Sequence, residues 1–214
     1  MTNGEILSHV DHTLLRADAT LGEIFSLCDE AVAYGTASVC IPPSYVCAAR
    51  VKYPQLNICT VIGFPLGYST SAVKLAELQQ AIADGADELD VVINLGDIKN
   101  GGLAAVSAEL EALRRAAEDK ILKIIIETCF LTDSEKIAMC EIVSRTGADY
   151  IKTSTGFGNA GAELSDIELF RSHIKNGVKI KASGGIRTRE AMEAFLSAGC
   201  DRLGTSSAVK ALIG

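Results

Sequence analysis

The segment Ala83–Leu89 reads ADGADEL, and it joins the end of an amphipathic stretch to the start of an apolar run. Four further segments follow the same plan: AYGTASV (33–39), RTGADYI (145–151), KNGVKI (175–180) and SAGCDRL (197–203). A glycine in this place is typical of a left-handed cap that ends a helix. The chain is therefore predicted to repeat one kind of helix-to-strand junction along its length.

Around these junctions, short apolar runs alternate with longer amphipathic stretches. The runs predict eight strands, at Ser8–Leu14, Thr36–Ile41, Asn57–Gly63, Glu88–Asn94, Leu122–Glu127, Asp149–Thr153, Val178–Ser183 and Arg202–Gly204. The stretches predict eight helices, near Leu21–Tyr34, Ser44–Lys52, Ser69–Asp84, Leu103–Glu118, Asp133–Thr146, Glu163–His173, Thr188–Ala198 and Ser206–Leu212. Eight βα units in a row predict a single-domain (β/α)₈ TIM barrel over residues 1–214. Because such barrels typically have ~250 residues, its loops should be short.

An open, doubly wound sheet is the alternative architecture. That fold places a phosphate-binding G-x-G-x-x-G sequence directly after its first strand. Here the corresponding segment, Arg16–Glu23, reads RADATLGE and lacks this spacing. The barrel is therefore the favoured prediction.

The composition narrows the class of partner. The chain has 214 residues, 48% of them hydrophobic, and a formal net charge of −7. Such a charge provides no long-range attraction for nucleic acid or an anionic membrane, so any phosphate must be held locally. The first residues, MTNGEILSHVDHTLL, show no basic region followed by an apolar one, and no later apolar run approaches a membrane span. We expect a cytoplasmic protein.

The cysteines are odd in number and scattered, with no C-x-x-C pair. This pattern favours reduced thiols, mostly buried as small apolar groups, over a disulfide framework or a zinc site. The seven positions are Cys28, Cys40, Cys47, Cys59, Cys129, Cys140 and Cys200.

Three ionisable residues lie where a barrel carries its catalytic groups, at or near the carboxyl ends of strands. Lys152 and Lys181 end the sixth and seventh predicted strands, and Asp90 interrupts the apolar run ELDVVIN of the fourth. Side-chain alternation places Asp90, Val92 and Asn94 on one face. We expect the two lysines and Asp90 to face one another across the barrel mouth.

This grouping predicts a reactive amine. A second ammonium group disfavours the charged form of the first, and partial desolvation acts in the same direction, so one lysine is expected to be neutral near pH 7. A neutral lysine is a nucleophile toward carbonyl carbon, and Asp90 with a water is suited to carry the protons of imine and enamine chemistry. Taken alone, each residue also fits a plainer role, as a solvated lysine or as an ion-pair partner.

Two glycine- and serine-rich loops predict a phosphate site. KASGGIRT follows the seventh strand and RLGTSSAVKAL runs from the eighth strand into a helix. Gly184, Gly185 and Gly204 allow close approach of the main chain, and Ser206 and Ser207 lie where a helix N-terminus offers free N–H donors. Either loop alone is an ordinary turn or cap, but loops after strands seven and eight often bind phosphate in barrels.

Other ionisable residues give weaker signals. Glu127 and Arg187 are candidates to line the pocket, Arg187 near phosphate, and both fit equally well as rim charges. His9 and His12 flank Asp11, but their odd spacing puts the two imidazoles on opposite faces of a strand, which argues against a shared metal.

In its motifs the sequence closely resembles the deoxyribose-phosphate aldolases over nearly the whole chain, from DHTLL (11–15) to GTSS (204–207). The most specific segments occur in the family's order. They are ELDVV (88–92), KIIIET (123–128), YIKTSTGF (150–157), KASGGIRT (181–188) and RLGTSS (202–207).

The resemblance implies a metal-free, cofactor-free class I aldolase that reversibly cleaves 2-deoxy-D-ribose 5-phosphate to acetaldehyde and D-glyceraldehyde 3-phosphate in deoxyribose phosphate catabolism. By match to the family, Lys152 forms the Schiff base, Lys181 perturbs it and Asp90 relays protons. The same match assigns phosphate binding to Gly156, Gly184, Gly185, Arg187, Gly204, Ser206 and Ser207. It also implies a homo-oligomer, with a homodimer favoured.

One residue departs from the family pattern. Some members carry a lysine directly after TSTG, where this chain has Phe157, so a possible phosphate contact is missing. Cys40, in VCIPP, matches a cysteine that members often place near the pocket, although burial explains it equally well. Because a fold and phosphate loops do not determine chemistry, another Schiff-base aldolase, a sugar-phosphate isomerase or a non-catalytic metabolite sensor stay open as alternatives.

Overall fold

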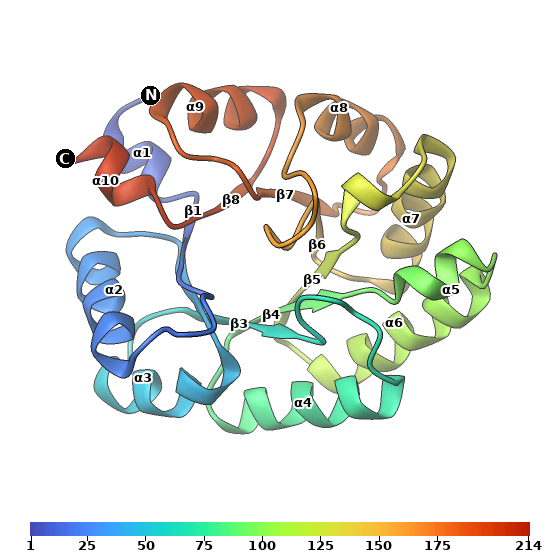
Figure 1. Cartoon of the computed structure of the whole chain (residues 1–214), viewed down its shortest axis with the longest axis horizontal. Helices are drawn as coiled ribbons and strands as arrows, with labels where there is room; N and C mark the ends of the chain where they lie inside the picture. The colour runs from blue at the N-terminus through green and yellow to red at the C-terminus, as the bar shows by residue number, and fades with distance from the viewer.

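The computed structural model describes residues 1–214 and shows the predicted closed barrel of eight parallel strands (Figure 1). The strands pair in chain order, and β1 closes the barrel by pairing with β8. They are β1 (Val10–Thr13), β2 (Ser38–Ile41), β3 (Ile58–Ile62), β4 (Glu88–Val92), β5 (Ile121–Ile125), β6 (Tyr150–Lys152), β7 (Lys179–Ser183) and β8 (Arg202–Thr205).

The helices form an outer ring around these strands (Figure 1). They are α1 (Asn3–Leu7), α2 (Leu21–Tyr34), α3 (Val46–Lys52), α4 (Ser71–Ala83), α5 (Leu95–Lys99), α6 (Leu103–Ala117), α7 (Asp133–Thr146), α8 (Leu164–His173), α9 (Arg189–Ala198) and α10 (Ala208–Leu212). Two short 3₁₀ helices, η1 (Pro43–Tyr45) and η2 (Thr128–Phe130), follow β2 and β5. The eight predicted helices are all present, and α2 and α7 have the predicted bounds.

Two helices were missed, and each shortens a predicted strand. Helix α1 begins with a capping box between Thr2 and Glu5, so β1 starts at Val10 rather than at Ser8. Helix α5 is capped by Asn94, whose side chain accepts a hydrogen bond from the N–H of Gly96. Asn94 therefore lies outside β4 and does not share a strand face with Asp90, contrary to the prediction. Both helices have only five residues, too few for an apolar period to be recognised.

The repeated glycine predicted to end helices is confirmed at most junctions. Gly35, Gly147 and Gly199 are left-handed C-caps of α2, α7 and α9, and Gly85, with φ of 102°, follows the cap of α4. Gly177 differs, because α8 ends at His173 and Ile174 caps it in an extended conformation. Four of the five junctions thus use glycine to turn directly toward the next strand.

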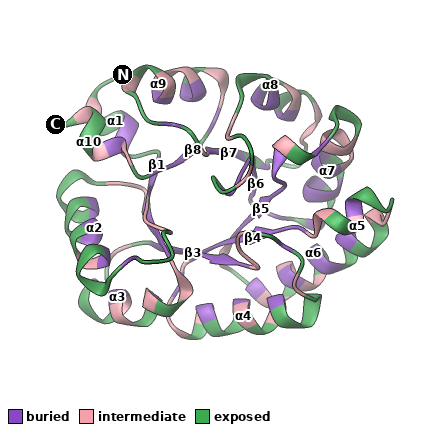
Figure 2. Cartoon of the chain, in the orientation of Figure 1, coloured by how far each residue is buried: buried purple, intermediate pink, exposed green.

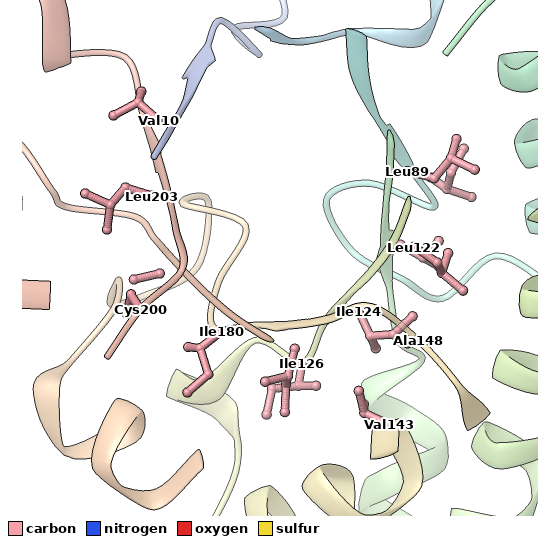
Figure 3. Packing of buried hydrophobic residues seen from close by; sticks show 14 of the residues in the cluster. Val10, Leu89, Leu122, Ile124, Ile126, Val143, Ala148, Ile180, Cys200 and Leu203 are labelled. Atoms are coloured by element: carbon pink, nitrogen blue, oxygen red, sulfur yellow. The ribbon is translucent and has the colours of Figure 1, made fainter. Parts of the chain in front are cut away.

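The apolar core lies between the barrel and the helix ring. Purple, buried residues cover the strands and the inner sides of the helices, whereas the outer sides are green and exposed (Figure 2). In Figure 3 the labelled strand residues Val10, Leu89, Leu122, Ile180 and Leu203 point away from the barrel axis toward the helices. They belong to one cluster of 47 buried residues.

Helix length and cysteine state bear on two further predictions. No helix combines the length and apolar character required to cross a bilayer. All seven cysteines are free thiols, and five are buried, whereas Cys47 is exposed and Cys129 is partly so. The prediction of mostly buried thiols is confirmed.

Candidate active site

The inside of the barrel is unusually polar for this fold, whose interior is normally filled by branched apolar side chains. Seven charged side chains, from β1, β4, β5, β6, β7 and β8, meet there. They are Asp11, Glu88, Asp90, Lys123, Lys152, Lys181 and Arg202. All except Arg202 are buried, and Arg202 is nearly so. We call this set the ion cluster.

Asp90 is the centre of the ion cluster. Its Oδ2 accepts hydrogen bonds from the Nζ atoms of Lys152 and Lys181, each at 2.6 Å, and its Oδ1 accepts one from Lys123 at 2.9 Å. Strand register explains the convergence, since Lys152 pairs with Lys181 and Asp90 pairs with Lys123. The predicted meeting of Asp90 with both lysines is therefore confirmed.

The charge state of Lys181 follows from its neighbours. Burial by itself lowers the pKa of Lys181, but the carboxylates of Asp11 and Asp90 outweigh it, so the pKa lies above its usual value. Burial raises the pKa of Asp90, but Lys123, Lys152 and Lys181 outweigh it and hold that pKa well below its usual range. Lys181 is thus a charged donor between two carboxylates, and it is not the neutral amine of the pair.

Sequence reasoning missed four members of the ion cluster: Asp11, Glu88, Lys123 and Arg202. Lys123 lies 2.5 Å from Glu88, and Arg202 contacts both Asp11 and Glu88. A signal was present for Glu88, which alternates with Asp90 on the same strand face. With all seven groups ionised, four cations face three carboxylates, so the cluster carries one excess positive charge.

Above the ion cluster, a cavity of about 330 Å³ opens at the carboxyl ends of the strands. Lys152 reaches its lining, whereas Asp90 and Lys181 are fully buried beneath it. The predicted phosphate-binding residues all line the same cavity. They are Gly156, Gly184, Gly185, Arg187, Gly204, Ser206 and Ser207.

These residues contribute in different ways. Gly185 and Ser206 line the cavity, and their backbone N–H groups donate no hydrogen bond within the chain. The N–H of Ser207 is not free, contrary to the prediction, because it donates to Thr205 Oγ1 at 3.0 Å. Gly204 is needed for space, since a Cβ there would lie 2.9 Å from Ser183 Cβ and 3.2 Å from Lys181 Cε.

Glu127 supports the loop that follows β6. It is buried, although it was expected at the pocket lining or the rim, and its carboxylate accepts from the N–H of Thr155 at 3.2 Å and from its hydroxyl at 2.5 Å. Burial raises the pKa of Glu127. Its backbone is left-handed, with φ of 50°. Glu127, a buried residue with a strained backbone, binds Thr155 and so holds in place the loop that directly follows Lys152.

An aromatic side chain forms another part of the cavity lining. Phe157 is 57% exposed, lines the cavity and meets Phe64 edge to face, with ring centroids 5.3 Å apart. The family's lysine position is thus occupied here by an apolar wall.

The cysteine and histidine candidates lie outside the cavity. Cys40 is buried beside Cys59, and hydrogen bonding to the Cys59 thiol lowers the pKa of Cys40 more than burial raises it. Ligand atoms of Cys40, Cys59 and Asp90 lie within 4.8 Å of one another, but the lysines on Asp90 make this a cationic setting that does not suit a metal. His9 contacts the Asp201 carbonyl and His12 contacts Glu30, so the histidines face apart as expected.

A closed (β/α)₈ barrel with a mouth cavity and ionised groups beneath it defines a TIM-barrel enzyme. The family model for DeoC/LacD family aldolases matches residues 6–205. The chain therefore belongs to the DeoC/LacD aldolase family.

Similarity to individual proteins agrees with this family. A deoxyribose-phosphate aldolase of Clostridium botulinum is 56% identical over 215 residues, covering 100% of this chain and 97% of the relative. One from Clostridioides difficile is 53% identical over 208 residues, covering 97% and 95%. A solved deoxyribose phosphate aldolase from Aeropyrum pernix, described as tetrameric, superposes with a TM-score of 0.93 at 34% identity, covering 99% and 91%.

Proposed function

We propose that this barrel is a deoxyribose-phosphate aldolase, an aldehyde-lyase that reversibly cleaves 2-deoxy-D-ribose 5-phosphate to acetaldehyde and D-glyceraldehyde 3-phosphate. The observation that carries the proposal is the position of Lys152, bonded to Asp90 at 2.6 Å at the base of a cavity rich in anion donors. The names of the relatives support the same substrate.

The reaction begins at Lys152. Its Nζ attacks C1 of the open-chain sugar, and loss of water from the carbinolamine gives an iminium ion. The hydroxyl on C3 then loses its proton and the C2–C3 bond breaks, which releases D-glyceraldehyde 3-phosphate and leaves an enamine. Protonation at C2 and addition of water release acetaldehyde and the free lysine. The iminium is the electron sink, so no metal or organic cofactor enters this route.

The ion cluster explains why Lys152 is the amine that reacts. Lys123 and Lys181 are held charged by carboxylates, and Arg202 is charged at all relevant pH values. Lys152 is the lysine of the cluster that lines the cavity, so it is the amine that a substrate carbonyl can reach. In this proposal Lys181 perturbs Lys152 by placing a second positive charge beside it, and Asp90, with a water, moves protons.

In this proposal, the glycine- and serine-rich loops of the cavity lining bind the phosphate. Gly185 and Ser206 supply free N–H groups, and the guanidinium of Arg187, which makes no ion pair within the chain, supplies charge. Gly156 and Gly184 keep the chain narrow here, because a Cβ on Gly184 would lie 3.3 Å from the Cα of Gly156. Neutral donors fixed by loops together with one guanidinium suit a phosphate dianion.

Assembly and location are further parts of the proposal. We expect a homo-oligomer, with a homodimer favoured, and the relative from Aeropyrum pernix, described as tetrameric, supports association in this family. The free thiols fit a reducing compartment and support a cytoplasmic location.

Borohydride trapping tests the central step. The protein is incubated with acetaldehyde, reduced and digested, and the modified peptide is identified by mass spectrometry, with Lys152→Ala and Lys181→Ala in parallel. An ethyl group on Lys152 that is absent from Lys152→Ala is the expected result. An adduct on Lys181 would reverse the two lysine roles, and no adduct at all would exclude a Schiff-base aldolase.

A further inference from the structure

The cavity lining has a charge that contrasts with the rest of the molecule. The chain carries a net charge of −7, yet the residues that line this cavity include no aspartate or glutamate. They include three cations, Lys152, Arg187 and Arg16. The first two already have roles in the proposed reaction, whereas Arg16 has none.

Barrel closure explains how Arg16 reaches this site. β1 pairs with β8, and β8 pairs with β7, so the loops that follow these strands lie side by side (Figure 1). Arg187 follows β7, Ser206 follows β8 and Arg16 follows β1. The loops that carry Arg16 and Arg187 therefore lie on either side of the loop that carries Ser206.

The ion pairs that Arg16 makes within the chain are exposed and therefore weak. Its guanidinium lies 2.6 Å from Asp18 and 2.5 Å from Glu23, and its side chain is 51% exposed. Asp18 and Glu23 are also well exposed, and exposed ion pairs contribute little to stability. Arg16 can exchange these carboxylates for a phosphate dianion without leaving a buried charge unpaired.

The loop after β6, residues 153–161, contains no lysine or arginine. Phe157, on the loop after β6, lines the same cavity, and its ring packs on Phe64. Without Arg16, Arg187 is the one guanidinium available to two phosphate charges.

We propose that Arg16 is a phosphate-binding residue of this enzyme, which clamps the 5-phosphate from the β1 side while Arg187 holds it from the β7 side. The inference rests on the proposed function and adds to it a determinant of selectivity for phosphorylated over unphosphorylated sugars. Arg16 replaces, from a different loop, the charge that the β6 loop lacks.

The test compares two substrates that differ only in the phosphate. The ratio of kcat/KM for 2-deoxy-D-ribose 5-phosphate to kcat/KM for 2-deoxy-D-ribose is measured in the wild type, Arg16→Gln and Arg16→Lys. We expect Arg16→Gln to lower this ratio about 10- to 100-fold, through KM for the phosphorylated sugar, because a charged hydrogen bond is lost. Arg16→Lys should keep part of the ratio. Arg115→Gln, an exposed change of equal charge on α6, should leave it unchanged.

A second variant separates binding from folding. Adding Phe157→Lys to Arg16→Gln places a cation on the β6 loop in the lining of the same cavity and should recover much of the ratio. An unchanged ratio in Arg16→Gln, or an equal loss with both sugars caused by damage to the start of α2, would overturn the proposal.

Inorganic phosphate gives a readout that does not depend on turnover. Its dissociation constant, measured by calorimetry, should rise in Arg16→Gln and stay unchanged in Arg115→Gln, and equal affinity in both variants would refute the role of Arg16. A wild type that binds phosphate but cleaves neither sugar would refute the proposed function and leave the Arg16 inference standing.

Discussion

Adjacent residues on one strand of this barrel are buried in opposite environments. Leu89 and Asp90 on β4 are both inaccessible to solvent, but Leu89 points outward into the apolar cluster, whereas Asp90 points inward and binds three lysines. Burial of apolar surface stabilises a fold, whereas burial of charges costs desolvation that only good pairing offsets. The comparison separates the residues that stabilise the barrel from those that the proposed reaction uses.

The largest expected effect is on the inner face. Lys152→Met should lower the rate of 2-deoxy-D-ribose 5-phosphate cleavage by on the order of 10⁴-fold or more, because the covalent intermediate is lost. Its free energy of unfolding in urea should stay the same or rise, since the substitution replaces a buried polar amine by an apolar side chain of similar length. Lys175→Met, at an exposed lysine, is the control. A Lys152→Met protein that keeps its activity would contradict the proposal that Lys152, on the inner face, carries the reaction.

Asp90→Asn should damage both activity and stability. Three ammonium groups lose the carboxylate they share, so we expect the free energy of unfolding to fall by about 3–5 kcal/mol. Loss of the proton carrier should lower kcat by about 10²- to 10⁴-fold. Both quantities are compared with Asp119→Asn, an exposed change of equal charge. A variant as stable as the wild type would mean that Asp90 contributes no net stability.

The outer face should respond in the opposite way. Leu89→Ala leaves a cavity between β4 and the helices, so the free energy of unfolding should fall by about 2–5 kcal/mol. The kcat of the folded fraction should stay near the wild-type value, because no charged group moves. A Leu89→Ala protein of normal stability but low kcat would show that the two faces are coupled through the strand.

Acid should weaken the stabilising contribution of the ion cluster, which lies on the inner face, and this is the smallest of the expected effects. Since the pKa of Asp90 is depressed in the folded state, its stabilising contribution is present above its unfolded pKa of about 3.9 and is lost as the pH falls toward the folded value. Below about pH 4, the urea midpoint of the wild type should therefore fall more steeply with pH than that of Asp90→Asn. Parallel curves would show that other carboxylates govern acid unfolding.

Much of the fold was predictable because its signals are local. Glycine caps such as Gly147 and alternating apolar runs report on the backbone of their own segment. The missed helices α1 and α5 depend on side-chain caps at Thr2 and Asn94 within very short segments. The meeting of Lys152, Lys181 and Asp90 was predictable because strand ends are where this fold places reactive groups.

The rest of the site was decided by closure of the barrel. Residues 11, 123 and 202 are far apart in the chain, and only strand register brings Asp11, Lys123 and Arg202 into one charge cluster. The charge state of Lys181 depends on that cluster, and it cannot be derived from two neighbouring lysines alone.

The sequence by itself determined the order of strands and helices, the caps between them and the identity of the strand-end lysines, because these depend on residues a few positions apart. Only the tertiary structure decided which charges pair, that Glu127 lies buried beneath a loop, and that Arg16 shares a cavity with Arg187. The physical reason is that electrostatic energies depend on distance in space and on burial, and both are known only once β1 pairs with β8.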